Sequence, residues 1–145
     1  MKKAFVFVSI TLLVLALAGV AAAHDFGGAP RVATLSGDQV VGGGDEDGSG
    51  FAAISLNVGK ELICWDVTFS GVENVFAGHI HQAPAGVNGG VVFPLNPLGH
   101  GCGSAAPALI QDIIDHPDQY YVQLHNDEFP MGVIRGQLSN RGQNK

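Results

Sequence analysis

Short runs rich in β-branched and aromatic residues alternate with glycine- and asparagine-containing turns along most of the chain. Such runs are typical of β-strands, and the glycines and prolines between them indicate turns. The pattern predicts strands at 31–36, 51–58, 61–69, 76–82, 90–95, 119–126 and 132–139. Several short strands joined by tight turns predict an all-β fold, an antiparallel β-sandwich or barrel.

One segment, 107–117, departs from the strand pattern. Its apolar residues Ile110, Ile113 and Ile114 follow the spacing of one helix face, and a proline stands at each end. Proline fits the first turn of a helix and also ends one, so we expect one short helix in a crossover between strands.

The first 23 residues have the layout of a secretory signal peptide. A positive start, MKK, precedes an apolar run and the small-residue stretch AAA. Cleavage after Ala23 leaves about 122 residues, enough for one compact domain. An uncleaved membrane anchor is the alternative, since the apolar run approaches the length of a membrane span. Cleavage makes His24 the first residue, where the amine and imidazole together could chelate copper; a frayed terminus is the simpler expectation.

The charge of the remaining chain limits its partners. Residues 24–145 hold five Lys and Arg against thirteen Asp and Glu, a net charge of −8 with histidine neutral. Nucleic acids and anionic membranes need a positive surface, so we expect neither as partner after signal cleavage. Another protein or the cell surface is the expected partner, and the signal peptide predicts a periplasmic or extracellular location.

The chain has two cysteines, Cys64 and Cys102. In an exported protein an even count indicates a disulfide, which here would join the strand 61–69 to the loop after Leu98. Two buried free thiols are the alternative.

Two histidines, His79 and His81, lie one residue apart in the stretch AGHIHQAPAG. Strand side chains alternate between the two faces of a sheet, so His79 and His81 point to the same face. By the same rule His125 and Arg135 point away from the apolar face of their own strands. If these strands are neighbours, His79, His81 and His125 could converge on one copper or zinc ion on the outer face. The alternative is three structural histidines that bond to backbone and carboxylates.

Arg135 has a simpler expected role than ligand binding. We expect a salt bridge to Asp66, Asp127 or Glu128, with anion binding as the alternative. The chain shows no nucleophile–base pair, paired-carboxylate site or phosphate loop, so no catalytic residue is predicted and an enzyme is the less favoured class.

Two ordered motifs, GHIHQAPAGVNGGVVFPL (78–95) and YYVQLHNDEFPMGVIRGQL (120–138), resemble the CHRD family, the domain named after chordin. The early stretches ATLSGDQVV and LICWDVTFSGV are also similar to its first strands. The resemblance implies a non-enzymatic, exported module. We expect the chain to divide into a signal peptide (1–23), an N-terminal segment with the first strand and an acidic glycine-rich loop (24–50), the remainder of the CHRD domain (51–139) and a disordered tail (140–145).

A more distant resemblance is to copper–zinc superoxide dismutase, which implies a Greek-key β-sandwich or barrel. On that analogy His79, His81 and His125 match three copper ligands. The fourth, bridging histidine has no clear counterpart, although His100 is a loop candidate. The alternative function is therefore a copper-binding redox protein of the dismutase type.

Overall fold

The computed structural model describes residues 27–141. The predicted signal peptide, its cleavage site and His24 lie outside the described residues, as do residues 142–145. The strands are β1 (Ala29–Ser36), β2 (Ser49–Asn57), β3 (Leu62–Ser70), β4 (Ala77–Gln82), β5 (Gly90–Pro94), β6 (His100–Ser104), β7 (Tyr120–His125), β8 (Ile134–Gln137) and β9 (Ser139–Asn140). The helices are α1 (Pro107–Asp115) and the short 3-10 helices η1 (Gly37–Gln39) and η2 (Pro117–Gln119).

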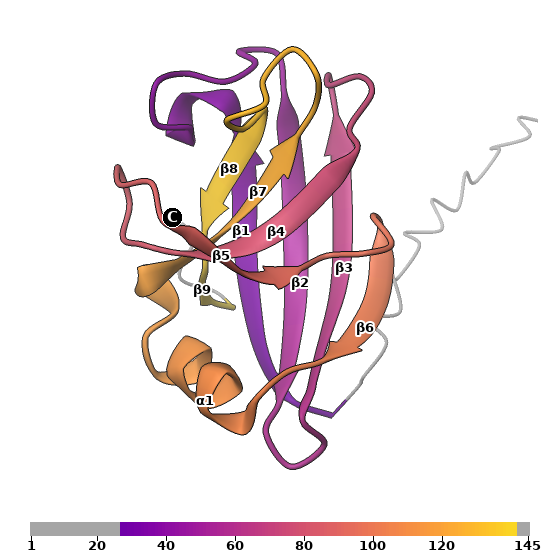
Figure 1. Cartoon of the computed structure of the whole chain (residues 1–145), viewed down its shortest axis with the longest axis vertical. Coiled ribbons are helices and arrows are strands. Elements are labelled where there is room, and N and C mark those ends of the chain that lie inside the picture. The colour runs from indigo at the N-terminus through magenta and orange to yellow at the C-terminus, as the bar shows by residue number, and fades with distance from the viewer. Residues whose placement is uncertain (1–26, 142–145) are drawn as a thin grey trace, which may run out of the picture.

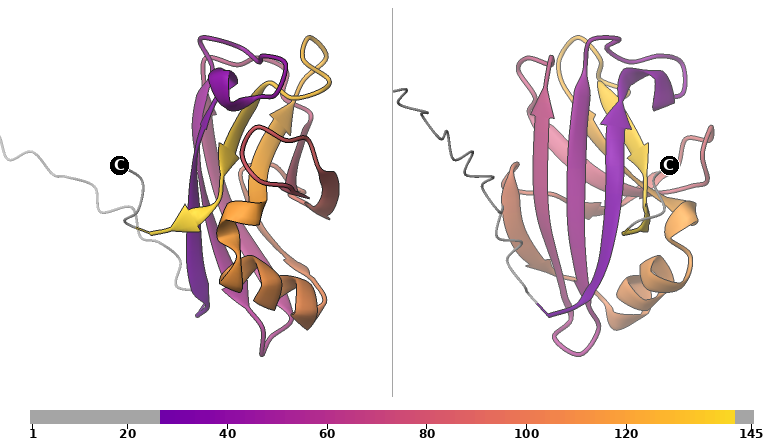
Figure 2. Two further views of the ribbon diagram at one scale, coloured as in Figure 1. Left: turned by 90° about the vertical axis from the view of Figure 1, so that its left-hand side faces the viewer. Right: turned by 180° about the vertical axis from the view of Figure 1, so that it is seen from behind.

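All nine strands belong to one hydrogen-bonded sheet. Its order is β5-β4-β7-β8-β1-β2-β3-β6, with β9 paired to β1, and every pairing is antiparallel. The sheet curls so that β1, β2 and β3 form one wall and β4, β5 and β7 the other, with α1 at one end (Figures 1 and 2). The predicted all-β antiparallel fold with one short helix is confirmed.

The apolar core lies inside this curl. Alternate residues of β2 and β3 point inward, and the pairs Ile54–Trp65 and Leu56–Ile63 are buried directly opposite each other. Helix α1 turns Ile110 and Ile113 into the same cluster. Burying each such side chain stabilises the fold by about 1.5–3 kcal/mol, so the predicted apolar faces account for how the sheet closes.

Strand β6 was not predicted, and its sequence HGCGS explains why. Glycine weakens a strand and offers no hydrophobic pattern, but here its lack of a side chain is required. A Cβ at Gly101 would lie 2.6 Å from the Trp65 ring, and one at Gly103 would lie 2.9 Å from the Phe93 ring. These two rings meet edge to face, with centroids 5.8 Å apart. The glycines therefore let β6 lie close against the aromatic pair.

The two cysteines join β6 to β3. Cys64 and Cys102 are directly opposite in the antiparallel register, and their Sγ atoms lie 2.11 Å apart, at disulfide distance. The segment expected to be a loop after Leu98 is thus an edge strand. Trp65 also donates its indole N–H to the carbonyl of Pro97, at 3.0 Å, which holds the connection between β5 and β6.

The last predicted strand, 132–139, is divided in two. β8 pairs with β7 and touches β1 at one position, whereas β9 pairs only with β1. Asn140, expected in a disordered tail, lies in β9 and pairs with Arg31 of β1. Within residues 27–141, no helix is long and apolar enough to cross a membrane.

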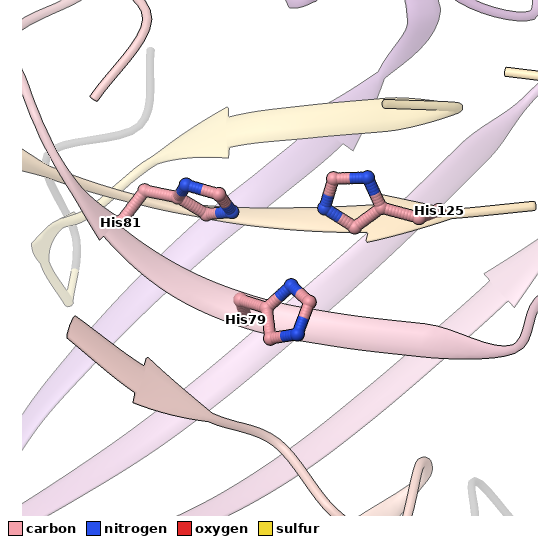
Figure 3. A group of neighbouring side chains, drawn as sticks. All are labelled: His79, His81 and His125. Carbon is pink, nitrogen blue, oxygen red and sulfur yellow. The ribbon is translucent and has the colours of Figure 1, made fainter. Parts of the chain in front are cut away.

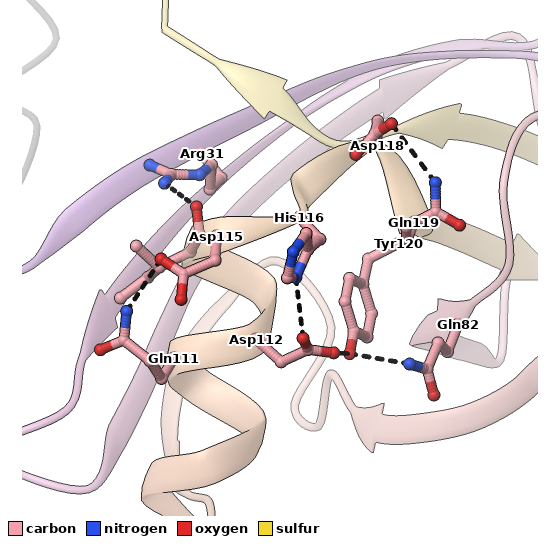
Figure 4. Close-up of polar contacts among 10 residues, drawn as sticks. Arg31, Gln82, Gln111, Asp112, Asp115, His116, Asp118, Gln119 and Tyr120 are labelled. Carbon is pink, nitrogen blue, oxygen red and sulfur yellow. Dashed lines mark hydrogen bonds and ion pairs between the residues drawn. The ribbon is translucent and has the colours of Figure 1, made fainter.

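A polar network fixes α1 to the sheet (Figure 4). Asp112 accepts a hydrogen bond from the Tyr120 hydroxyl and lies 2.9 Å from the His116 ring, and Gln82 donates to the same hydroxyl. The hydrogen bond from Tyr120 is the largest cause that lowers the pKa of Asp112, while burial raises the pKa of Tyr120. These hydrogen bonds anchor the helix to β4 and β7.

Candidate metal site

Strands β4 and β7 are neighbours, an adjacency that side-chain alternation alone could not establish. In their register Gln123 is opposite His79, and Tyr121 is opposite His81. His125 lies two residues beyond Gln123 on the same face. One ring nitrogen from each of the three histidines lies within 4.8 Å of the others. Figure 3 shows the rings turned toward a common point.

Backbone carbonyls orient two of the rings. His81 Nδ1 lies 3.0 Å from the carbonyl of Gly89, and His125 Nδ1 lies 3.0 Å from the carbonyl of Pro130. A carbonyl oxygen only accepts, so Nδ1 carries the proton in both rings. The Nε2 atom of each ring is left with its lone pair, as in histidines that bind a metal and donate their other ring N–H to the protein.

Each ring keeps one buried nitrogen without a hydrogen-bond partner in the protein: His79 Nδ1, His81 Nε2 and His125 Nε2. An unsatisfied buried polar atom costs about 1–3 kcal/mol, so three in one cluster need an explanation. Neutral imidazoles suit copper and zinc. Two ligands bound at about 2.0–2.1 Å to one ion lie roughly 3.3–4.2 Å apart, so small rotations of the rings close the site. The residues therefore fit a copper or zinc ion.

The electrostatics favour neutral rings. Burial is the largest cause that lowers the pKa of all three histidines. The neighbouring histidines lower the pKa of His79 further, and His125 and Arg135 do so for His81. Near neutral pH the cluster thus offers unprotonated nitrogens, the form that binds a metal.

Two loops cover the face that carries the cluster. The strands point Ile80, Val122 and Leu124 into the core, so the histidines lie on the other face, as the alternation predicts. This outer face is nevertheless shielded, because His81 is 7% exposed and His125 9%. Gly89 of the β4–β5 loop and Pro130 of the β7–β8 loop supply the carbonyls that orient the rings.

The expected salt bridge of Arg135 is wrong. The side chain is 1% exposed and donates to the carbonyls of Val87 and Pro84 at 2.9 and 3.0 Å. Its guanidinium carbon lies 3.4 Å from the centre of the Tyr121 ring, which in turn stacks on His81 with 4.8 Å between ring centroids. Backbone carbonyls and an aromatic face take the place of a carboxylate, and Arg135 holds the β4–β5 loop beside the cluster.

The other histidines lie apart from the cluster. His100 lies in β6, at the end of the strand order, and pairs with Asp66 of β3. His116 directly follows α1 and contacts Asp112 of that helix. In the part of the chain that the structure describes, only His79, His81 and His125 form a group able to hold a metal. No fourth histidine joins it, so the candidate role of His100 is not supported.

The lowered pKa values predict that the metal-free protein loses stability in mild acid. Each histidine has an ordinary pKa near 6.5 when unfolded and a lower pKa when folded. The unfolded chain thus binds more protons below pH 6.5, so the free energy of unfolding falls as pH drops from about 6.5 toward the folded pKa values and levels off below them. The pKa of Asp112 is lowered from its ordinary value of 3.8, so this carboxylate adds to the loss of stability only near pH 3.8 and below. Denaturant unfolding between about pH 7 and pH 5 measures the slope, and a flat profile would contradict the prediction.

The comparison with known families covers most of the described chain. The CHRD domain matches residues 31–138. No curated protein and no solved structure matches significantly. The family match includes all three clustered histidines, both cysteines and the loops that cover the site. The chain therefore belongs to the CHRD family.

Proposed function

We propose that this CHRD-family protein is an exported, non-enzymatic binding module that holds one copper or zinc ion through His79, His81 and His125. The observation that carries the proposal is the group of three buried, unpartnered ring nitrogens that lie within 4.8 Å of one another.

Structural histidines alone explain this cluster less well. A buried histidine with a purely structural role satisfies its polar atoms within the protein. Here His81 and His125 each use one nitrogen for a backbone carbonyl and turn the other toward two further imidazoles. An ion that accepts three lone pairs satisfies all of these nitrogens at once.

Export is supported by two features. The first 23 residues have the layout of a signal peptide, and a disulfide between Cys64 and Cys102 persists in an oxidising compartment. The acidic charge of residues 24–145 favours a protein or cell-surface partner over nucleic acid.

Metal titration tests the proposal directly. We expect metal-free protein to bind one equivalent of Cu²⁺ or Zn²⁺ at neutral pH, seen by calorimetry. Elemental analysis of protein exported in its native compartment and purified without added metal identifies the ion. The absence of saturable binding of both ions would leave the histidines with a structural role.

The redox alternative uses the same three histidines. We expect the copper-loaded protein to remove superoxide slowly, because no fourth histidine joins the cluster among residues 27–141. Rapid loss of superoxide in a standard assay would instead favour the dismutase-type function.

A further inference from the structure

The strand face that carries the three histidines holds a fourth buried atom without a hydrogen-bond partner. Within residues 27–141, five buried side-chain nitrogen or oxygen atoms lack a hydrogen-bond partner: His79 Nδ1, His81 Nε2, His125 Nε2, Gln123 Oε1 and Arg31 Nε. Four of these five belong to one face of β4 and β7. Gln123 is 3% exposed and occupies the β7 position opposite His79, two residues from His125.

The orientation of the Gln123 amide follows from its other contact. Its Nε2 donates to the carbonyl of Met131, at 2.5 Å. Because that carbonyl only accepts, the amide cannot be turned over, and Oε1 lies on the other side of the group. The backbone at Gly132 packs tightly against the same amide, since a Cβ there would lie 2.3 Å from Gln123 Nε2. The β7–β8 hairpin therefore occupies the nitrogen side of the amide.

The geometry points to Gln123 as a positioning residue of the metal site, whose Oε1 accepts a hydrogen bond from the water that completes the coordination of the ion. This inference rests on the proposed metal-binding function. Three histidines leave one position open on a four-coordinate ion, and water bound to a divalent cation is a strong hydrogen-bond donor. The carbonyl oxygen of Gln123 is buried without a partner on the strand face that carries the three imidazoles, and it is suited to accept that hydrogen bond.

The charge of the site agrees with this role. The groups that form it are three imidazoles, which bind a metal only in their neutral form, and one carboxamide, which does not ionise. A neutral acceptor orients water without adding a charge that would itself have to be buried. Gln123 thus orients the water without the negative charge that a carboxylate would add to the site.

Two variants separate this role from support of the hairpin. Q123L removes both the acceptor and the donor to Met131. Q123E removes the donor and keeps an oxygen that accepts. We expect Q123L to bind Cu²⁺ about tenfold more weakly than wild type, the range typical of groups that orient a metal's ligands. We expect Q123E to bind Cu²⁺ at least as tightly as wild type and to shift its visible and electron paramagnetic resonance spectra.

Gln82→Leu is the matched control. Gln82 follows His81 in β4, but its side chain donates to Tyr120 on the opposite face, so its loss should leave Cu²⁺ affinity and spectra unchanged. Equal weakening in Q123L and Q123E would assign Gln123 to the hairpin and overturn the inference, as would wild-type affinity and spectra in Q123L.

The proposed function and this inference fail in different ways. If wild-type protein binds neither Cu²⁺ nor Zn²⁺, both are overturned. If wild-type protein binds Cu²⁺ but Q123L and Q123E weaken binding equally, or Q123L keeps wild-type affinity and spectra, only the inference on Gln123 is overturned. Should Q123L fail to fold, Q123E decides alone: binding at wild-type strength or tighter with shifted spectra supports the inference, and weaker binding or unchanged spectra overturns it.

Discussion

Replacing His79, His81 or His125 singly by alanine is expected to weaken Cu²⁺ binding by about a hundredfold or more. Four-ligand zinc sites bind with about 10–16 kcal/mol, so each ligand contributes roughly 3 kcal/mol. The loss should be largest for His81 and His125, because backbone carbonyls already fix their rings with Nε2 free. Calorimetry with metal-free variants measures the change.

Two other histidines serve as controls for that experiment. His116→Ala and His100→Ala remove imidazoles at the C-terminal end of α1 and on β6, away from the cluster. Both variants should bind Cu²⁺ as wild type does. If the cluster variants also keep wild-type affinity while they remain folded by circular dichroism, the ion binds elsewhere and the proposed site is wrong.

The same experiment run in mild acid adds an independent check. Protonated imidazole does not bind a metal, so affinity should fall as pH drops. Because burial lowers the pKa of all three histidines, that fall should begin below the ordinary value of 6.5.

The strand face on which each histidine lies could be predicted from sequence, but which strands lie side by side could not. Alternation along β4 and β7 correctly separates His79, His81 and His125 from Ile80, Val122 and Leu124. Whether β4 pairs with β7 depends on how the whole chain folds, and the local sequence of either strand does not predict it. Alternation therefore predicted the three histidines together only on the condition that these strands are neighbours, and the distant resemblance to copper–zinc superoxide dismutase matched them to three copper ligands.

The covering loops were missed for a related reason. Their contacts with the site are made by backbone carbonyls of residues such as Pro84, Gly89 and Pro130. Every residue has a backbone carbonyl, so residue types do not reveal such contacts. Arg135 therefore suggested a carboxylate partner, although its donors meet carbonyls. The burial of Gln123 could not be predicted either, because a glutamine in a strand is usually exposed to solvent.

The second large effect is expected from the disulfide. Cys64 and Cys102 are 38 residues apart in sequence. Closing a loop of that length stabilises a folded chain by about 4 kcal/mol on the chain-entropy model. Reduction should therefore lower the unfolding temperature by about 10 °C or more for a domain of this size.

The location of the disulfide specifies how the reduced protein should loosen. β6 lies at one end of the strand order and pairs only with β3, and its two glycines contribute little side-chain packing of their own. Once the covalent link is broken, we expect β6 to separate first and expose Trp65, seen as a red shift of its fluorescence. Copper affinity should stay near the wild-type value, because the histidines lie on β4 and β7. Two thiols that react with an alkylating agent in the oxidised, folded protein, or an unchanged unfolding temperature after reduction, would show that no such link stabilises the domain.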